Sequence, residues 1–423
     1  MQVMKWSALA LAVTAATTQL AFASAQSESN GLIEDTSFDI FNRVLYMNRD
    51  YKNRYNDGKN TAGTGDNGYR EETGYGLRLL LESGFTQGTV GVGFDAHSLS
   101  SIKLDSGSGR YGTGQFDKDS DGNGADTQTE VGGAIKFRVS DTVLKYGNQF
   151  VGSPVFSTDD SRILPEVATG TYIVSNEIEG LELSGGHFTA GSSQTSTDRD
   201  TAGLKSADIV GISYQFTDNF SAAFHASDVE DYWKKYYGNL NYTLGDLNFD
   251  FNIYQTDYEK EYSADEFDDN TIWSLGASYS LGAHTFTLGY QRSTGDHGYD
   301  YGVDGGGTVW LTNSVQYSDF NGEDERSYQA RYDLDMTEYG VPGLSFMTRY
   351  ITGDNITTDS GDEGKEHEWD IEAKYVVQEG AAKDLSFRVR HAVWRANDAY
   401  NAQYDDSDLN DTRLIVEYPL DVL

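Results

Sequence analysis

Basic side chains recur on one side of several segments near the end of this 423-residue chain. Arg388 and Arg390 are separated by one apolar residue, so both project from the same face of an extended strand. Lys374 shares a phase with Glu372, and Arg413 lies on the polar phase of the last segment. Guanidinium groups bind carboxylates through paired hydrogen bonds. Two interpretations stay open: these charges brace one another across an interior space, or they present a line of donors to an anionic group.

Residues of other chemistries give weaker patterns. No Gly-x-Ser-x-Gly motif is present, and no metal-ligand spacing joins the seven histidines, which are His97, His187, His225, His284, His297, His367 and His391. A hydrolase assembles its residues by folding, so an outer-membrane hydrolase remains the alternative from another class. The sequence predicts no enzyme and no cofactor.

One acidic segment resembles the first half of a calcium-binding loop. Asp117, Asp119 and Asp121 alternate before Gly122, but the twelfth position is Gln128 and supplies no bidentate carboxylate. A solvated acidic loop is the favoured interpretation, and calcium binding is left open.

The elements that would position the basic residues are short alternating strands. In residues 247–254, Leu, Phe, Phe and Ile occupy one face and Asn, Asp, Asn and Tyr the other. Similar segments occur at 38–49, 72–83, 87–99, 129–139, 143–151, 168–179 and 181–190. Each is close to the about ten residues that a tilted transmembrane strand needs. Charges on the polar face are acceptable in a wet lumen but costly in a protein core, so we expect an all-β transmembrane barrel.

Connections alternate between short and long, which is typical of an outer-membrane barrel. Turn-like joins occur at 179–180, 217–219, 244–246, 281–282 and 339–343, and long polar segments at 50–71, 100–128, 152–167, 191–204, 258–269, 295–307, 354–365 and 397–408. Nineteen segments alternate if 308–319 is counted. Both chain ends should lie on one side, so the number must be even, and we assign 308–319 to an inward-folding loop. Eighteen antiparallel strands leave an aqueous lumen.

Residues 152–170 break the strand pattern most strongly. They contain Pro154 and Pro165, two of the four prolines in the chain, with ionisable residues between them. Proline donates no ladder hydrogen bond, so this segment cannot be a central strand. We expect it to fold into the lumen as a constriction loop.

Composition supports export to a membrane. Residues 1–23 carry Lys5, an apolar run and small residues, which predicts a signal peptide cleaved near 23–25, leaving 24–423 as one barrel domain. The chain has no cysteine and 38% hydrophobic residues, yet 29 Tyr, 20 Phe and 6 Trp suit an aromatic belt in contact with membrane lipid. A net charge of −36 argues against nucleic-acid binding and suggests acidic loops over a channel mouth.

Eight stretches resemble the OprD family of substrate-specific outer-membrane porins over essentially the whole mature chain. They lie at 31–35, 46–50, 82–90, 154–162, 313–322, 339–344, 372–377 and 383–390. The resemblance implies a monomeric eighteen-stranded channel in the outer membrane of a Gram-negative bacterium. It also implies a narrow eyelet with a ladder of basic residues opposite an electronegative patch.

By motif position, the resemblance assigns residues to both walls of the eyelet. The implied ladder is Arg49, Arg70, Arg162, Lys374, Arg388, Arg390 and Arg413. The implied electronegative side includes Tyr317 and Asp319, with Ser314 close by. Asp159 and Asp160 stand where the family often has small neutral residues. We expect these two carboxylates to pair with Arg162, weakening its hold on anions and favouring cationic solutes.

The predicted function is passive uptake of small carboxylate-bearing or zwitterionic solutes. The resemblance implies basic amino acids and related small peptides as the leading class, and entry of carbapenem antibiotics through some members. Serial weak sites would bind the carboxylate on the ladder while Asp319 and Tyr317 hold the other end. The alternatives are a channel for cyclic carboxylates such as benzoate, or a general diffusion porin.

Overall fold

A computed structural model describes residues 24–52, 68–106, 110–259, 269–300, 302–303, 306–404, 406 and 408–423. The predicted signal peptide, residues 1–23, lies outside the described residues. So do 53–67 and 260–268, within two of the predicted long loops.

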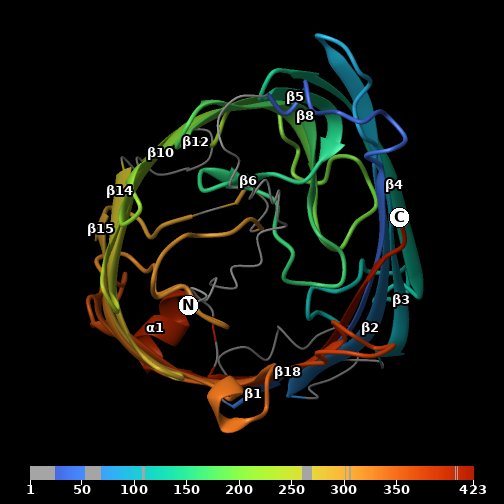
Figure 1. The fold of residues 1–423 in the computed structure, drawn as a ribbon. Coiled ribbons are helices and arrows are strands. Elements are labelled where there is room, and N and C mark those ends of the chain that lie inside the picture. The colour runs from blue at the N-terminus through green and yellow to red at the C-terminus, as the bar shows by residue number, and fades with distance from the viewer. Residues whose placement is uncertain are drawn as a thin grey trace.

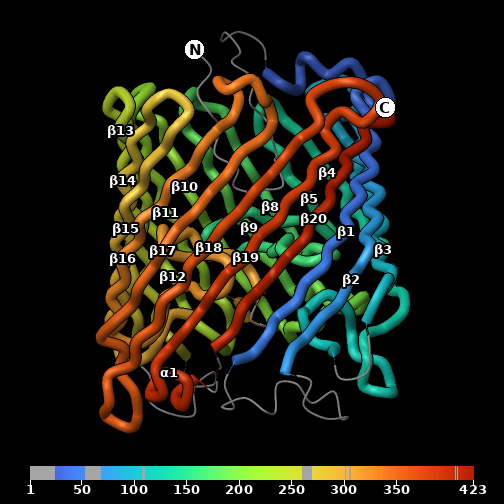
Figure 2. Tube along the Cα trace, turned by 90° about the horizontal axis from the view of Figure 1, so that it is seen from below, coloured from blue at the N-terminus to red at the C-terminus, as the bar shows by residue number. Residues whose placement is uncertain are grey.

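Eighteen antiparallel strands form one sheet that closes on itself, because β1 pairs with both β2 and β20 (Figures 1 and 2). The strands are β1 (Ser37–Tyr51), β2 (Tyr69–Glu82), β3 (Gly91–Ser106), β4 (Thr127–Val139), β5 (Thr142–Gln149), β8 (Val167–Ile178), β9 (Leu181–Ser192), β10 (Ala207–Thr217), β11 (Phe220–Val229), β12 (Trp233–Leu244), β13 (Leu247–Tyr258), β14 (Asp269–Leu281), β15 (His284–Gly295), β16 (Arg326–Asp335), β17 (Leu344–Ile356), β18 (Gly364–Val376), β19 (Ser386–Ala396) and β20 (Leu409–Asp421). The predicted eighteen-stranded barrel is confirmed.

The few remaining elements lie in connections. β6 (Gly152–Ser153) and β7 (Phe156–Ser157) form a small hairpin inside the barrel, α1 (Asp398–Gln403) precedes β20, and a 3₁₀ turn spans Thr337–Tyr339. Within the described residues, no helix is long and apolar enough to cross a membrane. Segment 308–319 contains no strand, as its assignment to an inward loop predicted.

Both ends of one predicted strand were wrong. Segment 87–99 forms a strand only from Gly91, and this strand continues to Ser106 rather than ending at 99. Gly88 has φ +115°, a backbone conformation that favours glycine and interrupts an extended chain. The preceding turn therefore takes the first residues of the predicted segment.

The apolar face of each strand points outward. Phe346, Ile371, Val389 and Leu414 on β17–β20 are 42%, 45%, 49% and 44% exposed, whereas Glu368 on the alternate phase of β18 is fully buried. Outward aromatic rings also contact one another across strands, as Trp273, Tyr290 and Tyr328 do. The polar face therefore lines the lumen, which settles the orientation that alternation alone leaves open.

The proline-rich loop and the described residues of segment 296–311 pack inside the barrel over an apolar cluster. Val155 of the loop, Val151 directly before it, and Tyr299 and Leu311 of the second segment belong to the cluster, together with Tyr254 from β13. Phe156 stacks on Phe188 of β9 with ring centroids 4.9 Å apart. This apolar contact holds the two inward segments against the wall formed by β9–β14.

On the opposite wall, the proline-rich loop lies directly on β2. Gly74 and Gly76 face the lumen there, and a β-carbon on Gly76 would lie 2.9 Å from the carbonyl oxygen of Ile163. One on Gly74 would lie 2.8 Å from the Ile163 side chain. The two glycines therefore allow loop backbone to approach the barrel wall closely.

Substituting Gly76 should loosen the loop without opening the barrel. In Gly76→Ala the new methyl group overlaps the Ile163 carbonyl, and such overlaps cost about 1–3 kcal/mol. We expect larger single-channel current fluctuations with an unchanged folded band on an unheated gel. Gly185→Ala on β9 is the control, because its nearest atoms would lie 3.6 Å away. Equal current fluctuations in both variants would contradict the close contact between the proline-rich loop and β2 at Gly76.

Candidate constriction and solute path

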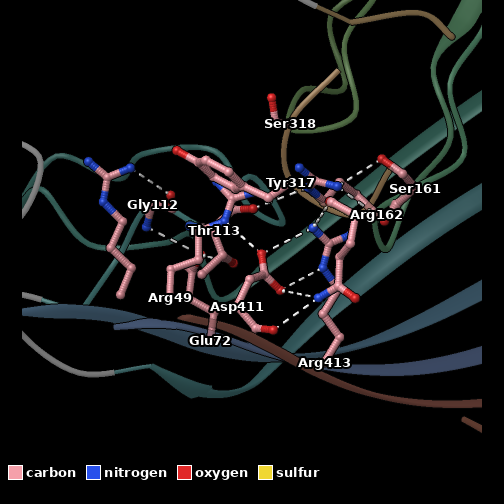
Figure 3. A network of polar contacts seen from close by, with 12 residues as sticks. Arg49, Glu72, Gly112, Thr113, Ser161, Arg162, Tyr317, Ser318, Asp411 and Arg413 are labelled. Atoms are coloured by element: carbon pink, nitrogen blue, oxygen red, sulfur yellow. Dashed lines mark hydrogen bonds and ion pairs between the residues drawn. The ribbon is translucent and has the colours of Figure 1, made fainter. Parts of the chain in front are cut away.

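Arg162 is held at the tip of the proline-rich loop by a second loop from β3–β4. Its Nε donates to the Thr113 carbonyl at 3.2 Å, and Nη1 donates to Ser161 Oγ at 2.8 Å. Thr113 is itself fixed to β2, because its N–H and Oγ1 donate to Glu72 Oε2 at 2.7 and 2.6 Å (Figure 3). Two loops and one wall carboxylate thus position this guanidinium.

Beside Arg162, a buried carboxylate joins two more arginines. Asp411 of β20 accepts from Arg49 Nε at 3.0 Å and from Arg413 Nε at 2.8 Å (Figure 3). The Asp411 side chain is fully buried, whereas Arg49 keeps 17% exposure and lies 5.3 Å from the centre of the Tyr317 ring. Asp411 therefore orients two guanidinium groups while neutralising only one unit of their charge.

The second inward segment continues beyond 311 through residues 312–325, and this part is fixed to β18 and β20. Tyr317 N–H and Ser318 N–H donate to the two oxygens of Glu368 at 2.9 and 2.8 Å. Arg413 Nη2 donates to the Gln316 carbonyl at 2.9 Å. The main chain of this segment is therefore held at two points, by the Glu368 carboxyl group and by the Arg413 guanidinium.

The predicted electronegative residues lie together on this segment. Ser314 Oγ donates to Asp319 Oδ1, and the Tyr317 hydroxyl donates to the carboxylate of Asp406 at 2.9 Å. The main-chain carbonyl of Asp319 accepts from Gln291 Nε2 at 2.8 Å, which anchors the segment to β15. Hydroxyl and carboxylate groups thus gather on the segment that carries Tyr317.

Six of the seven predicted basic residues lie on adjoining strands. The cross-strand pairing shows the order in which they follow one another around the barrel wall. Arg70 is opposite Arg49 on β2 and β1, and β1 pairs with β20. Arg413 of β20 is opposite Arg390 of β19, and Arg388 is opposite Lys374 of β18. The row therefore runs in the order Arg70, Arg49, Arg413, Arg390, Arg388 and Lys374. Arg162 joins it from the loop.

Few acidic side chains pair with the arginines of β19 in this row. Glu372 lies 3.7 Å from Arg388 Nε and 3.2 Å from Arg390 Nε, yet neither nitrogen donates a hydrogen bond to any described residue. Like charges directly opposite each other destabilise a sheet by about 0.2–1 kcal/mol. Arginines that face arginine or lysine across strands are therefore not explained by stability.

Neither predicted partner of Arg162 pairs with it among the described residues. Asp159 accepts from Ser161 N–H at 3.0 Å and from Gln194 Nε2 at 3.0 Å. Asp160 instead forms ion pairs with Arg43 of β1 and Arg78 of β2. The predicted direct pairing with Arg162 is therefore not found, because Asp159 bonds Ser161 and Gln194 and the loop turns Asp160 toward the wall, whereas the predicted preference for cationic solutes stays a prediction.

Several residues of the site were not predicted. Asp411 stands two positions before Arg413, and Glu368 lies in phase with Glu372 and Lys374, so the two-residue period was an available signal for both. Glu72 gave no such signal, because its role depends on the folded position of the Thr113 loop.

The acidic segment 117–122 forms a self-contained turn. Asp119 Oδ1 accepts from the N–H groups of Asp121 and Asn123 at 2.9 and 2.8 Å, and Asp117 Oδ1 accepts from Lys118 N–H. Across the described residues, no group of three or more His, Cys, Asp or Glu residues is arranged to hold a metal ion. The carboxylates of Asp117 and Asp119 thus accept hydrogen bonds from the main chain of this turn.

Comparison with known proteins gives matches along the whole chain. The profile described as "outer membrane porin, OprD family" matches residues 30–422. The Porin D of Pseudomonas aeruginosa is 46% identical over 462 aligned residues, which cover 100% of both chains.

Solved structures match as well. The crystal structure of Acinetobacter baumannii OccAB1 aligns with a TM-score of 0.86 at 32% identity, covering 95% of this chain and 100% of that chain. That of Pseudomonas aeruginosa OpdK with vanillate aligns with a TM-score of 0.81 at 34% identity, covering 93% of this chain and 100% of that chain.

Removing Glu368 should free the second inward segment. Glu368→Ala deletes two hydrogen bonds to a buried carboxyl group, each contributing about 0.5–1.5 kcal/mol, so the segment around Tyr317 should become mobile. Planar bilayer recordings should show frequent sublevels that the unmodified channel lacks. Glu379→Ala, at an exposed residue after β18, should leave the recordings unchanged. Steady currents in Glu368→Ala would argue against this anchoring.

Proposed function

Because this chain belongs to the OprD family of outer membrane porins, as its motifs predicted, we propose that it is a channel selective for small carboxylate-bearing or zwitterionic solutes. Its place is the outer membrane of a Gram-negative bacterium. Basic amino acids and related small peptides are the leading solute class, and carbapenem antibiotics would share the route.

The row of cations is the observation that carries this proposal. Arg49, Arg413, Arg390, Arg388 and Lys374 follow one another along β1, β20, β19 and β18. Neighbouring strands lie about 4.8 Å apart and positions two residues apart on one strand about 6.6 Å, so a carboxylate can contact the next donor before leaving the last. Serial weak sites allow binding without trapping, which conduction requires.

The opposite pole would hold a cationic or polar group. Asp319, Ser314 and the Tyr317 hydroxyl gather on the inward segment, and Asp406 adds a carboxylate beside that hydroxyl. Tyr317 also lies over Arg49, so the two poles meet at this ring. A zwitterion that spans both poles gains a hydrogen bond at each end, whereas a neutral sugar gains neither charged contact.

A channel for cyclic carboxylates is the second candidate. OpdK, which was crystallised with vanillate, is 34% identical to this chain. The cationic row would accept an aromatic carboxylate equally well, so the two candidates differ only in the group that meets Asp319. A general diffusion pore is less favoured, because two inward segments occupy the lumen.

The proposed channel is a monomer and not an enzyme. Pairing of β1 with β20 closes the eighteen-stranded sheet within one chain, so among the described residues the barrel wall has no open strand edge to pair with a second copy. Its partners would then be solutes and outer-membrane lipid, with no nucleic acid and no cofactor.

Liposome swelling with arginine, benzoate and a neutral sugar of similar size tests the solute class. We expect arginine to enter fastest relative to its size, because it offers both a carboxylate and a cationic end. Faster entry of benzoate would favour the cyclic carboxylate channel. Rates that depend only on solute size would reject specificity altogether, and hydrolysis of a lipid or peptide without transport would favour an enzyme.

Arg390 provides a direct test of the row. Arg390→Ala should slow carboxylate entry about threefold to tenfold, because one charge-assisted contact of about 1 kcal/mol is lost, and should shift ion selectivity toward cations. Reversal potentials in a salt gradient measure the second effect. Arg395→Ala is the matched control, since Arg395 lies on the opposite phase of β19. Unchanged reversal potentials in Arg390→Ala would mean that the row is structural.

A further inference from the structure

Two lumen-facing arginines outside the cationic row contact the proline-rich loop. Arg43 of β1 and Arg78 of β2 are each 4% exposed at the side chain, whereas Arg390 keeps 21%. Both guanidinium groups lie near the ring of Phe41, 5.2 and 5.0 Å from its centre. Charges this deeply buried require counter-charges or a full set of hydrogen bonds.

Asp160 is the counter-charge that these two arginines share. Its Oδ1 lies 2.9 Å from Arg43 Nη1 and also pairs with Arg78 Nη2. The Asp160 side chain is 8% exposed. Glu417, opposite Arg43 on β20, completes the group at 2.8 Å from Arg43 Nη2. Two cations and two anions therefore form a neutral cluster between the loop and the wall.

The same two arginines also bind the main chain of the loop. Arg43 Nη1 donates to the carbonyls of Asp160 and Arg162, and Arg78 Nη2 donates to the carbonyl of Ile163 at 3.0 Å. Residues 160, 162 and 163 are thus fixed on β1 and β2, with Ile163 directly over Gly76. The side chain of Arg162 lies at the centre of this fixed stretch.

We propose that Asp160 sets the charge selectivity of the channel by neutralising Arg43 and Arg78 and seating the loop, so that the solute meets Arg162 rather than these two wall arginines. This inference rests on the proposed function, because it concerns which donors a carboxylate encounters. Without Asp160, the cluster keeps two cations and one anion. Among the described residues, Arg78 would then have no carboxylate within ion-pair distance, and an anion from solution could bind there.

Asp160→Asn tests the charge while keeping the shape of the side chain. We expect the chloride-to-potassium permeability ratio to rise about fourfold, because one unit charge acting through about 10 Å of water changes the permeation of each ion about twofold, and in opposite directions for chloride and potassium. Carboxylate swelling rates relative to a neutral sugar should rise in the same direction. Asp228→Asn, at an exposed residue on the outer face of β11, is the control for loss of an aspartate.

A second substitution separates the two effects of Asp160, which are neutralising the wall arginines and attaching the loop to the wall. Adding Arg78→Met to Asp160→Asn removes the uncompensated charge but also removes another contact to the loop. We expect the permeability ratio to return to that of the unmodified channel. A ratio that stays high, with current fluctuations larger than in Asp160→Asn, would mean that Asp160 acts only as an anchor and would overturn the proposal.

The outcomes distinguish this inference from the proposed function. An unmodified channel that admits solutes by size alone would reject the proposed function, while the reversal potentials would still report on Asp160. A selective unmodified channel whose permeability ratio is the same in Asp160→Asn would reject this inference alone. Both variants are first checked for an unchanged folded band on an unheated gel, so that a misassembled barrel is not scored.

Discussion

Closure of the sheet is the constraint on which the rest of this structure depends. Main-chain polar groups of a membrane-spanning strand find no water among lipid tails, so they must pair within the protein. Pairing of β1 with β20 meets this requirement and leaves no open edge. Closure in turn forces the polar face of every strand into one shared lumen, where charges from distant parts of the chain become neighbours.

Those shared charges then determine where the inward loops lie. On the side of β9–β14 the loops contact an apolar cluster that includes Tyr254 and Tyr299. On the side of β1, β2, β18 and β20 they are held by carboxylates and arginines, among them Glu72, Glu368 and Arg43. On the apolar side the loops are held by side-chain packing, whereas on the charged side hydrogen bonds fix individual main-chain groups. The constriction is therefore most precisely positioned where the solute-binding charges also stand.

Period-two alternation was sufficient to predict the barrel and most of the cationic row. Arg388 and Arg390 could be placed on a lumen face because their apolar neighbours had to face lipid. The partner of Asp160 could not be predicted in the same way. Sequence proximity favoured Arg162, but a loop residue is oriented by its turn and by the wall it touches, and Arg43 and Arg78 are 117 and 82 positions away. The Thr113–Glu72 contact was missed for the same reason, and the extent of β3 depended on the turn at Gly88.

This difference between strands and loops suggests how selectivity can vary while the fold stays constant. A strand residue such as Arg413 cannot change its face without a register shift that would expose every neighbour to the wrong environment. A loop carboxylate carries no such restriction, because only its own contacts depend on it. A change in a loop carboxylate can neutralise a wall arginine or leave it unpaired. Such a change alters the charges that a solute meets, and the main-chain pairing of the barrel stays intact. Asp160 occupies such a position, since it touches β1 and β2 without belonging to either strand.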